Sequence, residues 1–298
     1  MRFFIVDVFA EQKYAGNPLA VFVLDRELPA TDMQQITREI HFSESTFIKP
    51  GVREGGFDVR IFTPDREVPF AGHPTLGTAF VIRSLLKWQP GNRIVLNLGV
   101  GPIAVDVDGD VLTMQQNQPR FDAPIADRAR VASILGINFD DLDERLPVQV
   151  VSTGLPFVIV PLRTRRAVAQ CAIQHALYRR FLNEVVQASL LVFAAETEDA
   201  KNDLHARVFV DDTGFFEDPA TGSANGNLAA YVVEHGVFGK SDVGYRVEQG
   251  CEMGRPSLLR IQASKRGGEF SIRVGGRVFP VADGEWLHES MRATTASA

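Results

Sequence analysis

One stretch decides the fold: EDPATGSANG, residues 217–226. It follows an expected strand, residues 206–210, and it precedes an apolar run, residues 228–233, that is typical of a helix. A turn of small residues there leaves the backbone N–H groups of a helix N-terminus available to bind a carboxylate. A related stretch, PFAGHPTLG, occupies residues 69–77. The two turns together predict a site with two jaws for a small anionic substrate.

The two turns belong to two halves of the chain that match in order. Gly16-Asn17-Pro18 corresponds to Gly154-Leu155-Pro156 at an offset of 138 residues, and Arg60-Ile61-Phe62 corresponds to Arg207-Val208-Phe209 at an offset of 147. Thr75 is matched with Ser223 at an offset of 148. Offsets that drift slowly are typical of a duplicated domain. We therefore expect an α+β protein with two pseudo-symmetric domains, residues 1–118 and 119–298, each a mostly antiparallel sheet around a central helix.

Period-2 and period-3.6 apolar patterns predict the individual elements. Strands are expected at residues 3–9, 20–24, 46–49, 57–62, 93–98, 149–151, 157–161, 189–194, 206–210, 257–263, 269–274 and 277–282, with a hairpin over 103–115. Helices are expected at residues 31–40, 75–86, 127–135, 175–187 and 228–233, the first beginning at a Thr31 cap. Residues 117–127 contain two prolines and little periodicity, and they are the expected domain linker. The last strand, at the C-terminus, is a candidate to return to the first domain.

The composition excludes several classes of function. The chain has 298 residues, of which 45% are apolar, and its formal net charge of −6 argues against a nucleic-acid partner. The basic clusters at residues 163–166 and 179–180 are short, and they are expected to form solvated faces. No apolar run reaches the ~18 residues that a membrane span needs. The N-terminus reads as a strand, so a cytoplasmic protein without a membrane partner is expected.

No motif for a metal or a cofactor is found. Cys171 and Cys251 form no CxxC pair, and both are expected to be reduced and buried. The six histidines show no metal-binding spacing. Residues 99–104 match the G-x-G-x-x-A spacing, but a strand pattern follows them, so a dinucleotide would have no helix N-terminus to bind. We expect neither metal nor cofactor.

Four polar side chains stand at the two turns or at a helix-to-strand junction. Glu44 lies among Ser and Phe residues, where partial desolvation raises a carboxylate pKa towards general acid–base catalysis. His73 lies in the first turn, and Asp218 and Ser223 lie in the second. Each alone has an ordinary explanation, such as a helix-end carboxylate, a structural histidine, an N-cap or a turn hydroxyl. Together they predict an acid–base site.

The chain resembles the PhzF-like phenazine-biosynthesis isomerase family. Five segments carry the resemblance, in order along nearly the whole chain: residues 42–47, 62–64, 69–74, 217–224 and 249–257. The resemblance implies the diaminopimelate epimerase-like fold, with two β-barrel-like domains, a site in the cleft between them, and a homodimer. It implies that Glu44 shuttles the proton, and that His73, Asp218 and Ser223 hold and polarise the substrate. The turns around Gly72 and Gly222 would offer N–H groups to its carboxylate.

The turns differ from those of the epimerase relatives, which use a cysteine at each turn as a two-base pair. Here the matching positions are assigned to Ala71 and Pro219. This indicates a one-carboxylate proton transfer on a small amino- or hydroxy-carboxylate. The family's namesake isomerises trans-2,3-dihydro-3-hydroxyanthranilate to a ketone that feeds phenazine biosynthesis. That substrate, another small acid, a metabolite-binding protein without turnover, and an epimerase that uses Cys171 and Cys251 are all left open.

Overall fold

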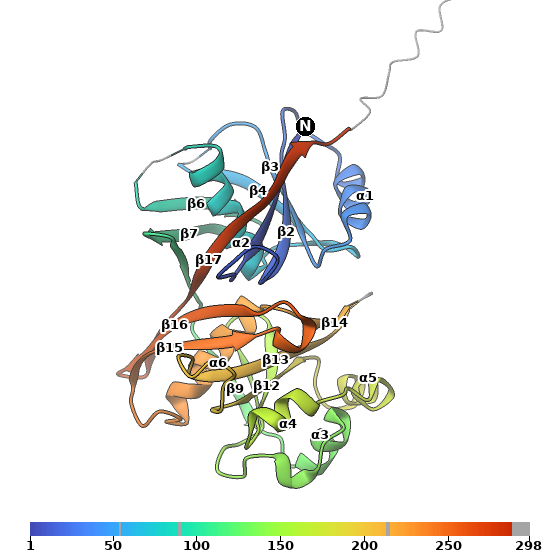
Figure 1. Ribbon diagram of the computed structural model, residues 1–298, viewed down its shortest axis with the longest axis vertical. Helices are drawn as coiled ribbons and strands as arrows, with labels where there is room; N and C mark the ends of the chain where they lie inside the picture. Colours follow the sequence, from blue (N-terminus) through green and yellow to red (C-terminus); the bar gives the residue numbers. More distant parts are fainter. Residues whose placement is uncertain (54, 89–90, 213–214, 288–298) are drawn as a thin grey trace, which may run out of the picture.

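The computed structural model describes residues 1–53, 55–88, 91–212 and 215–287 (Figure 1). The first part of the chain contains β1 (Arg2–Val8), β2 (Asn17–Val23), α1 (Ala30–Ile40), β3 (Ser45–Ile48), β4 (Phe57–Phe62), β5 (Glu67–Val68), α2 (Gly72–Phe80), the π-helix η1 (Val81–Leu85), β6 (Arg93–Leu98), β7 (Gly101–Asp108) and β8 (Val111–Gln115). The second part contains β9 (Arg120–Pro124), α3 (Arg128–Leu135), η2 (Phe139–Asp141), β10 (Gln149–Ser152), β11 (Pro156–Pro161), α4 (Arg165–Gln170), α5 (His175–Glu184), β12 (Ser189–Ala194), β13 (Leu204–Asp212), β14 (Phe215–Asp218), α6 (Gly222–Glu234), β15 (Asp242–Gln249), η3 (Cys251–Met253), β16 (Ser257–Arg266) and β17 (Glu269–Glu285).

The strands of the two parts pair in the same sequence. In the first part β2 pairs parallel with β3, and β4 pairs antiparallel with β5 and parallel with β6. In the second part β11 pairs parallel with β12, and β13 pairs antiparallel with β14 and parallel with β15. Helices α2 and α6 therefore occupy equivalent places. Most other pairings are antiparallel, which confirms the predicted α+β class, and the repeated order of pairings confirms the predicted pseudo-symmetry.

The last strand links the two bodies that Figure 1 shows one above the other. β17 pairs with β16 and β8 over its first half and with β1 over its second half, where Val278 lies opposite Val8. It is one strand, whereas the sequence predicted two. Gly275 and Gly276 allow the crossing because a Cβ there would lie 2.4 Å from Thr113 Oγ1 and 2.6 Å from Phe9 Cδ1, respectively. The domain boundary at residue 118 stays a prediction.

Three other sequence predictions need correction. The expected linker contains strand β9, whose Phe121 lies opposite Val151 of β10. Of the two prolines in the linker, Pro119 precedes the strand and Pro124 ends it. Helix α1 begins after Pro29, so Thr31 lies inside the helix and does not cap it. Helix α2 begins at Gly72, three residues before the predicted start, and a π-helical turn follows it.

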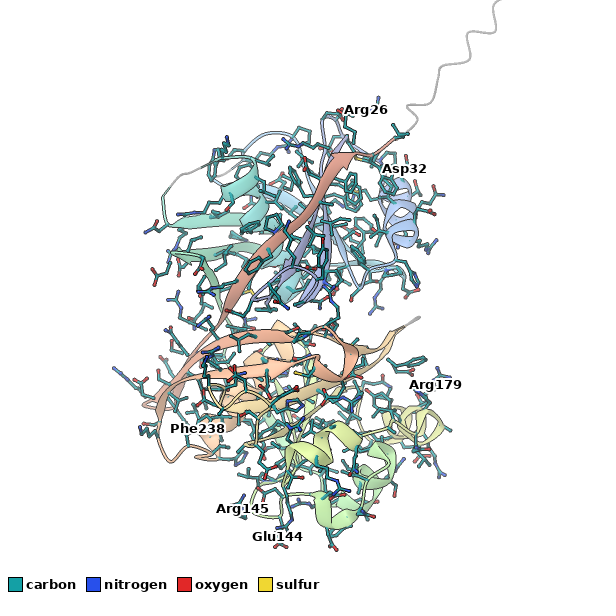
Figure 2. All side chains as sticks on the ribbon, in the orientation of Figure 1. Arg26, Asp32, Glu144, Arg145, Arg179 and Phe238 are labelled. Atoms are coloured by element: carbon teal, nitrogen blue, oxygen red, sulfur yellow. The ribbon has the colours of Figure 1, made fainter. Side chains whose placement is uncertain are left out.

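The basic clusters lie on the surface, as predicted. Arg179 projects from α5 (Figure 2), and its side chain is 62% exposed and paired with Asp211. Arg180, 70% exposed, pairs with Glu184 on the same helix. These side chains are locally neutralised by acidic neighbours, so they form no continuous basic surface.

The two central helices are buried in the main hydrophobic core. Helix α6 contributes Leu228, Tyr231 and Val232, and helix α2 contributes Leu76 and Ala79. Helix α2 also packs closely on the first sheet. A Cβ added at Gly77 would lie 2.6 Å from Leu19 Cδ2 and 2.9 Å from Val8 Cγ2. Helix α2, which begins at the first turn, is therefore packed against β1 and β2 with little spare volume.

We expect Gly77→Ala to lower the free energy of unfolding by about 1–3 kcal/mol, because the added methyl group overpacks the contact with Leu19 and Val8. Urea unfolding at neutral pH measures it. Gly244→Ala is the matched control, since its Cβ would meet no atom closer than 3.9 Å. If both variants unfold at the wild-type midpoint, helix α2 does not pack on these strands as described.

Candidate active site

The N-termini of helices α2 and α6 meet at the junction of the two halves. A Cβ at Gly72 would lie 3.4 Å from Gly222 Cα and 3.4 Å from the backbone nitrogen of Ser223. Met114 Cε lies 3.2 Å from the same position, and Phe9 lies 3.3 Å from a Cβ at Gly222. Among the described residues, no side chain caps either helix. Two helix ends with available N–H groups and positive partial charge thus share one junction.

The helix starts correct the alignment of the two turns. The N-cap residue is Ala71 in α2 and Thr221 in α6, so the offset is 150 residues. His73 therefore corresponds to Ser223. The predicted match of Thr75 with Ser223 is wrong by two positions, because the two similar hydroxyl side chains lie at different distances from their helix starts.

A repeated hydrogen bond supports the new alignment. Thr75 Oγ1 donates to the carbonyl oxygen of Ala71 at 2.7 Å, and Asn225 Nδ2 donates to that of Thr221 at 3.0 Å. The counterpart of Ala71 is therefore Thr221, whereas the sequence analysis assigned Pro219. Neither turn carries a thiol at these positions.

Glu44 and His73 are in contact on the first half. Glu44 lies between α1 and β3, and its Oε2 is 3.6 Å from Nε2 of His73, with side chains 18% and 5% exposed. A hydrogen bond of 2.8 Å between Thr46 Oγ1 and Thr78 Oγ1 ties β3 to α2 and so fixes the distance between the two elements. Burial lowers the pKa of His73 to about 3, although a backbone hydrogen bond to Pro18 opposes this. His73 is therefore neutral at physiological pH and can orient, but not neutralise, a carboxylate.

Asp218 leads into the second turn. Burial raises its pKa to about 6, although hydrogen bonds from Thr221 and Asn17 lower it in part. Asn17 Nδ2 donates to Asp218 Oδ1 at 2.8 Å across the junction of the halves. A carboxyl group that titrates near pH 6 can change charge within the physiological range.

Gln249 holds the second turn in shape. Its Nε2 donates to the carbonyl oxygen of Asp218 at 2.7 Å, and its Oε1 accepts hydrogen bonds from Thr221 N at 3.3 Å and Asn225 Nδ2 at 2.9 Å. Gln249 and Asn17 contact the second turn but were not among the predicted site residues, although both lie in segments with a sequence signal. The repeated Gly-x-Pro motif around Asn17 was the available signal.

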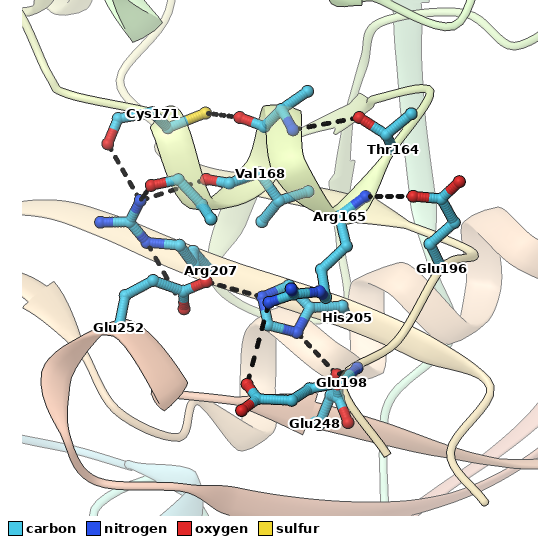
Figure 3. A network of polar contacts seen from close by, with 12 residues as sticks. Thr164, Arg165, Val168, Cys171, Glu196, Glu198, His205, Arg207, Glu248 and Glu252 are labelled. Atoms are coloured by element: carbon cyan, nitrogen blue, oxygen red, sulfur yellow. Dashed lines mark hydrogen bonds and ion pairs between the residues drawn. The ribbon is translucent and has the colours of Figure 1, made fainter. Parts of the chain in front are cut away.

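A network of ion pairs lies behind the second turn (Figure 3). Arg207 donates from Nε and Nη2 to both carboxylate oxygens of Glu217, each at 2.8 Å. His205 Nδ1 lies 2.8 Å from Glu248, and its Nε2 lies 2.8 Å from Glu252. Burial alone would lower the pKa of His205, but its two carboxylate partners outweigh burial and raise it to about 9. The network therefore contains a protonated histidine at neutral pH.

The thiols are poor candidates for proton transfer. Cys171 is buried, as predicted, and its Sγ donates to the carbonyl oxygen of Ala167 at 3.4 Å. Cys251 is free as predicted, but it is only partly buried. Burial raises the pKa of each thiol to about 12, so neither supplies a thiolate at neutral pH.

Residues 1–53, 55–88, 91–212 and 215–287 contain no group of three or more His, Cys, Asp or Glu side chains that could hold a metal ion. None of the helices in the same ranges has the length and apolar character to cross a membrane.

Comparison with known proteins identifies relatives over nearly the whole chain. The family described as phenazine biosynthesis-like protein (PhzC-PhzF) matches residues 6–284. An uncharacterized isomerase of Mesorhizobium japonicum is 32% identical, over 95% of this chain and 98% of its own. A trans-2,3-dihydro-3-hydroxyanthranilate isomerase of Pseudomonas fluorescens is 34% identical, over 92% and 95% of the respective chains. The solved PhzF-family structure from Bacillus anthracis has a TM-score of 0.89 at 26% identity and covers 97% of this chain and 99% of that one.

Proposed function

This chain belongs to the phenazine biosynthesis-like (PhzC-PhzF) family and is an isomerase, and we propose that it moves a proton within a small amino- or hydroxy-carboxylate without a cofactor. The observation that supports this most is the contact between Glu44 and neutral His73. His73 belongs to helix α2, whose N-terminus meets that of α6. Glu44, which can accept and donate a proton, is thereby placed beside the junction of two helix N-termini, which is suited to bind an anion.

In this proposal each residue has a distinct task. Glu44 removes a proton from one carbon and returns it to another, which needs only one base held near both positions. His73 positions that carboxylate as a neutral imidazole in contact with it, 3.6 Å from Nε2 to Oε2. The N–H groups of the turns at Gly72 and Gly222 bind the substrate carboxylate. Asp218 and Ser223 fix the rest of the substrate.

The substrate class has two candidates. One is trans-2,3-dihydro-3-hydroxyanthranilate, because the relative from Pseudomonas fluorescens bears the name of that isomerase. The other is a different small acid bound by the same turns, because the shared motifs concern the proton-transfer residues and not the whole pocket. We also propose a cytoplasmic homodimer, and sedimentation at the monomer mass would refute the dimer.

Solvent deuterium incorporation tests the reaction. The protein is incubated in deuterated buffer with a panel of small amino and unsaturated carboxylic acids, and exchange at carbon is followed by NMR. We expect exchange with at least one member of the panel, unchanged in Cys171→Ala and Cys251→Ala. Binding without any exchange would instead indicate a metabolite-binding protein, and loss of exchange in either cysteine variant would indicate thiol chemistry.

Asp218→Asn is expected to stabilise the fold while impairing the reaction. Because the folded-state pKa of Asp218 is raised from 3.8 to about 6, stability falls as pH rises through this window, by about 3 kcal/mol at neutral pH. The variant should recover much of this loss at pH 7 and none below pH 3.8. Its kcat/KM should fall at least ~tenfold. The pH–rate profile of the variant should also lose the acidic limb near pH 6.

Urea unfolding of both proteins at pH 7 and at pH 3.5, together with a pH–rate profile, measures these effects. An equal difference in stability at both pH values would contradict the assignment, because a group that titrates between them must give a pH-dependent difference.

A further inference from the structure

We infer that Asn17 both positions Asp218 and reads the substrate: its amide nitrogen holds the second turn, while its amide oxygen accepts a hydrogen bond from an amino or hydroxyl group beside the bound carboxylate. This inference rests on the proposed function, since it assigns the ligand class of the same site.

The amide nitrogen of Asn17 is fully used by the opposite half of the protein. It donates to Asp218 Oδ1 at 2.8 Å and to the carbonyl oxygen of Ala220 at 3.0 Å. The backbone carbonyl can only accept, so it identifies the nitrogen end of the amide. Asn17 is 0% exposed. A side chain from the first half thus secures the turn that begins the second jaw.

The amide oxygen of Asn17 is buried and has no hydrogen-bond partner among the described residues. A buried acceptor without a donor costs about 1–3 kcal/mol. The oxygen is bonded to the same carbon atom as the nitrogen that donates to Asp218, so it belongs to the side chain that joins the two halves at this turn. This orphaned acceptor indicates that a hydrogen-bond donor arrives with the ligand.

The loop that presents Asn17 is fixed by residues of the second half. Gly16 has a φ of +68°, and a Cβ there would lie 2.3 Å from the carbonyl oxygen of Val8, so only glycine fits. Its N–H donates to the carbonyl oxygen of Pro256 at 3.1 Å, and its own carbonyl accepts from Arg255 Nε at 2.9 Å. The surrounding structure therefore fixes the backbone from which the Asn17 side chain extends.

The chemistry of the neighbouring groups selects the ligand class. The helix N-termini at Gly72 and Gly222 suit a carboxylate, whereas Asp218 and the oxygen of Asn17, whose nitrogen bonds to Asp218, are two acceptors. Two acceptors favour an amino or hydroxyl group and disfavour a second carboxylate. The site is therefore built for a carboxylate with an adjacent donor.

Binding of anthranilate and benzoate, which differ by one amino group next to the carboxylate, tests the oxygen. By isothermal calorimetry at pH 7 we expect wild type to bind anthranilate at least ~tenfold more tightly. Asn17→Ala should weaken this preference, because Asp218 is then the remaining acceptor. Asn17→Asp should keep it, because an oxygen acceptor remains. Asn17→Leu, near in size, replaces Asn17→Ala if the smaller side chain leaves the protein unfolded.

The pH profile of deuterium exchange tests the nitrogen. Both Asn17→Ala and Asn17→Asp remove the N–H donor to Asp218, so the acidic limb should move to higher pH in both. Asn227→Ala is the matched control, because Asn227 is equally buried but bonds to Val151, Thr153 and Leu155 instead. It should change neither the limb nor the ligand preference.

Three results would overturn the inference. Equal wild-type binding of the two acids, or an undiminished preference in Asn17→Ala or Asn17→Leu, would refute the reading role. An unmoved acidic limb would refute the positioning role. Failure of the proposed function looks different, because wild type would then show no deuterium exchange while the calorimetric contrast between the two acids persisted.

Discussion

Glu44→Gln is expected to lower the rate of proton transfer by about 10²–10⁴, the range that a positioned general acid–base group contributes. Glutamine has nearly the shape of glutamate but cannot take up a proton from carbon. Substrate affinity should change little, because in the proposed binding mode the helix N-termini at Gly72 and Gly222, and not Glu44, bind the substrate carboxylate. Deuterium exchange measures the rate, and calorimetry with anthranilate measures the affinity.

Glu39→Gln provides the matched control, because it makes the same substitution at an exposed carboxylate of helix α1. It should leave exchange and binding at wild-type values. If Glu44→Gln exchanges at the wild-type rate, the base lies elsewhere, and Asp218, with its pKa of about 6, is the next candidate. His73 is a weaker one, because burial lowers its pKa to about 3 and makes it a poor base.

The sequence predicted the fold well where local chemistry determines an element. The two small-residue turns mark the starts of α2 and α6, and most strands appear as apolar alternation. β15 was missed although Val243, Tyr245 and Val247 alternate with polar residues, so the signal was present. The split of β17 had another cause: Gly275 and Gly276 resemble a break locally, and only the packing against Thr113 and Phe9 shows why they continue a strand.

The candidate site was predictable in residue types but not in contacts. Glu44 and His73 could be singled out from their local surroundings, and their contact follows from the pairing of β2 with β3 and the seating of α2. The bond from Asn17 to Asp218 spans 201 positions of sequence, and no local pattern encodes it. The two-residue error in matching the turns arose because a hydroxyl group, and not a helix start, was taken as the common point.

The other large effect concerns the ion-pair network behind the second turn (Figure 3). His205→Ala is expected to lower the free energy of unfolding by about 3–5 kcal/mol, because it leaves the buried Glu248 and the partly buried Glu252 without the cation between them. Urea unfolding at pH 6.5 measures the difference. His175→Ala, which removes an exposed ring on helix α5, is the control and should change stability by less than about 0.5 kcal/mol.

The pH dependence distinguishes this ionic role from simple loss of packing. The folded-state pKa of His205, about 9, lies above its ordinary value of 6.5, so its contribution is complete below pH 6.5 and is lost as pH rises through 9. The pKa of Glu248 is lowered to about 2, since its hydrogen bonds, that of His205 foremost, outweigh burial, so its contribution is complete above pH 4.5 and is lost as pH falls through 2. The difference between wild type and His205→Ala should therefore be largest between pH 4.5 and 6.5 and should shrink by pH 9.5. A difference that stayed constant from pH 6 to pH 9.5 would show that the imidazole acts only by filling space, and that Arg207 alone neutralises the carboxylates of the network.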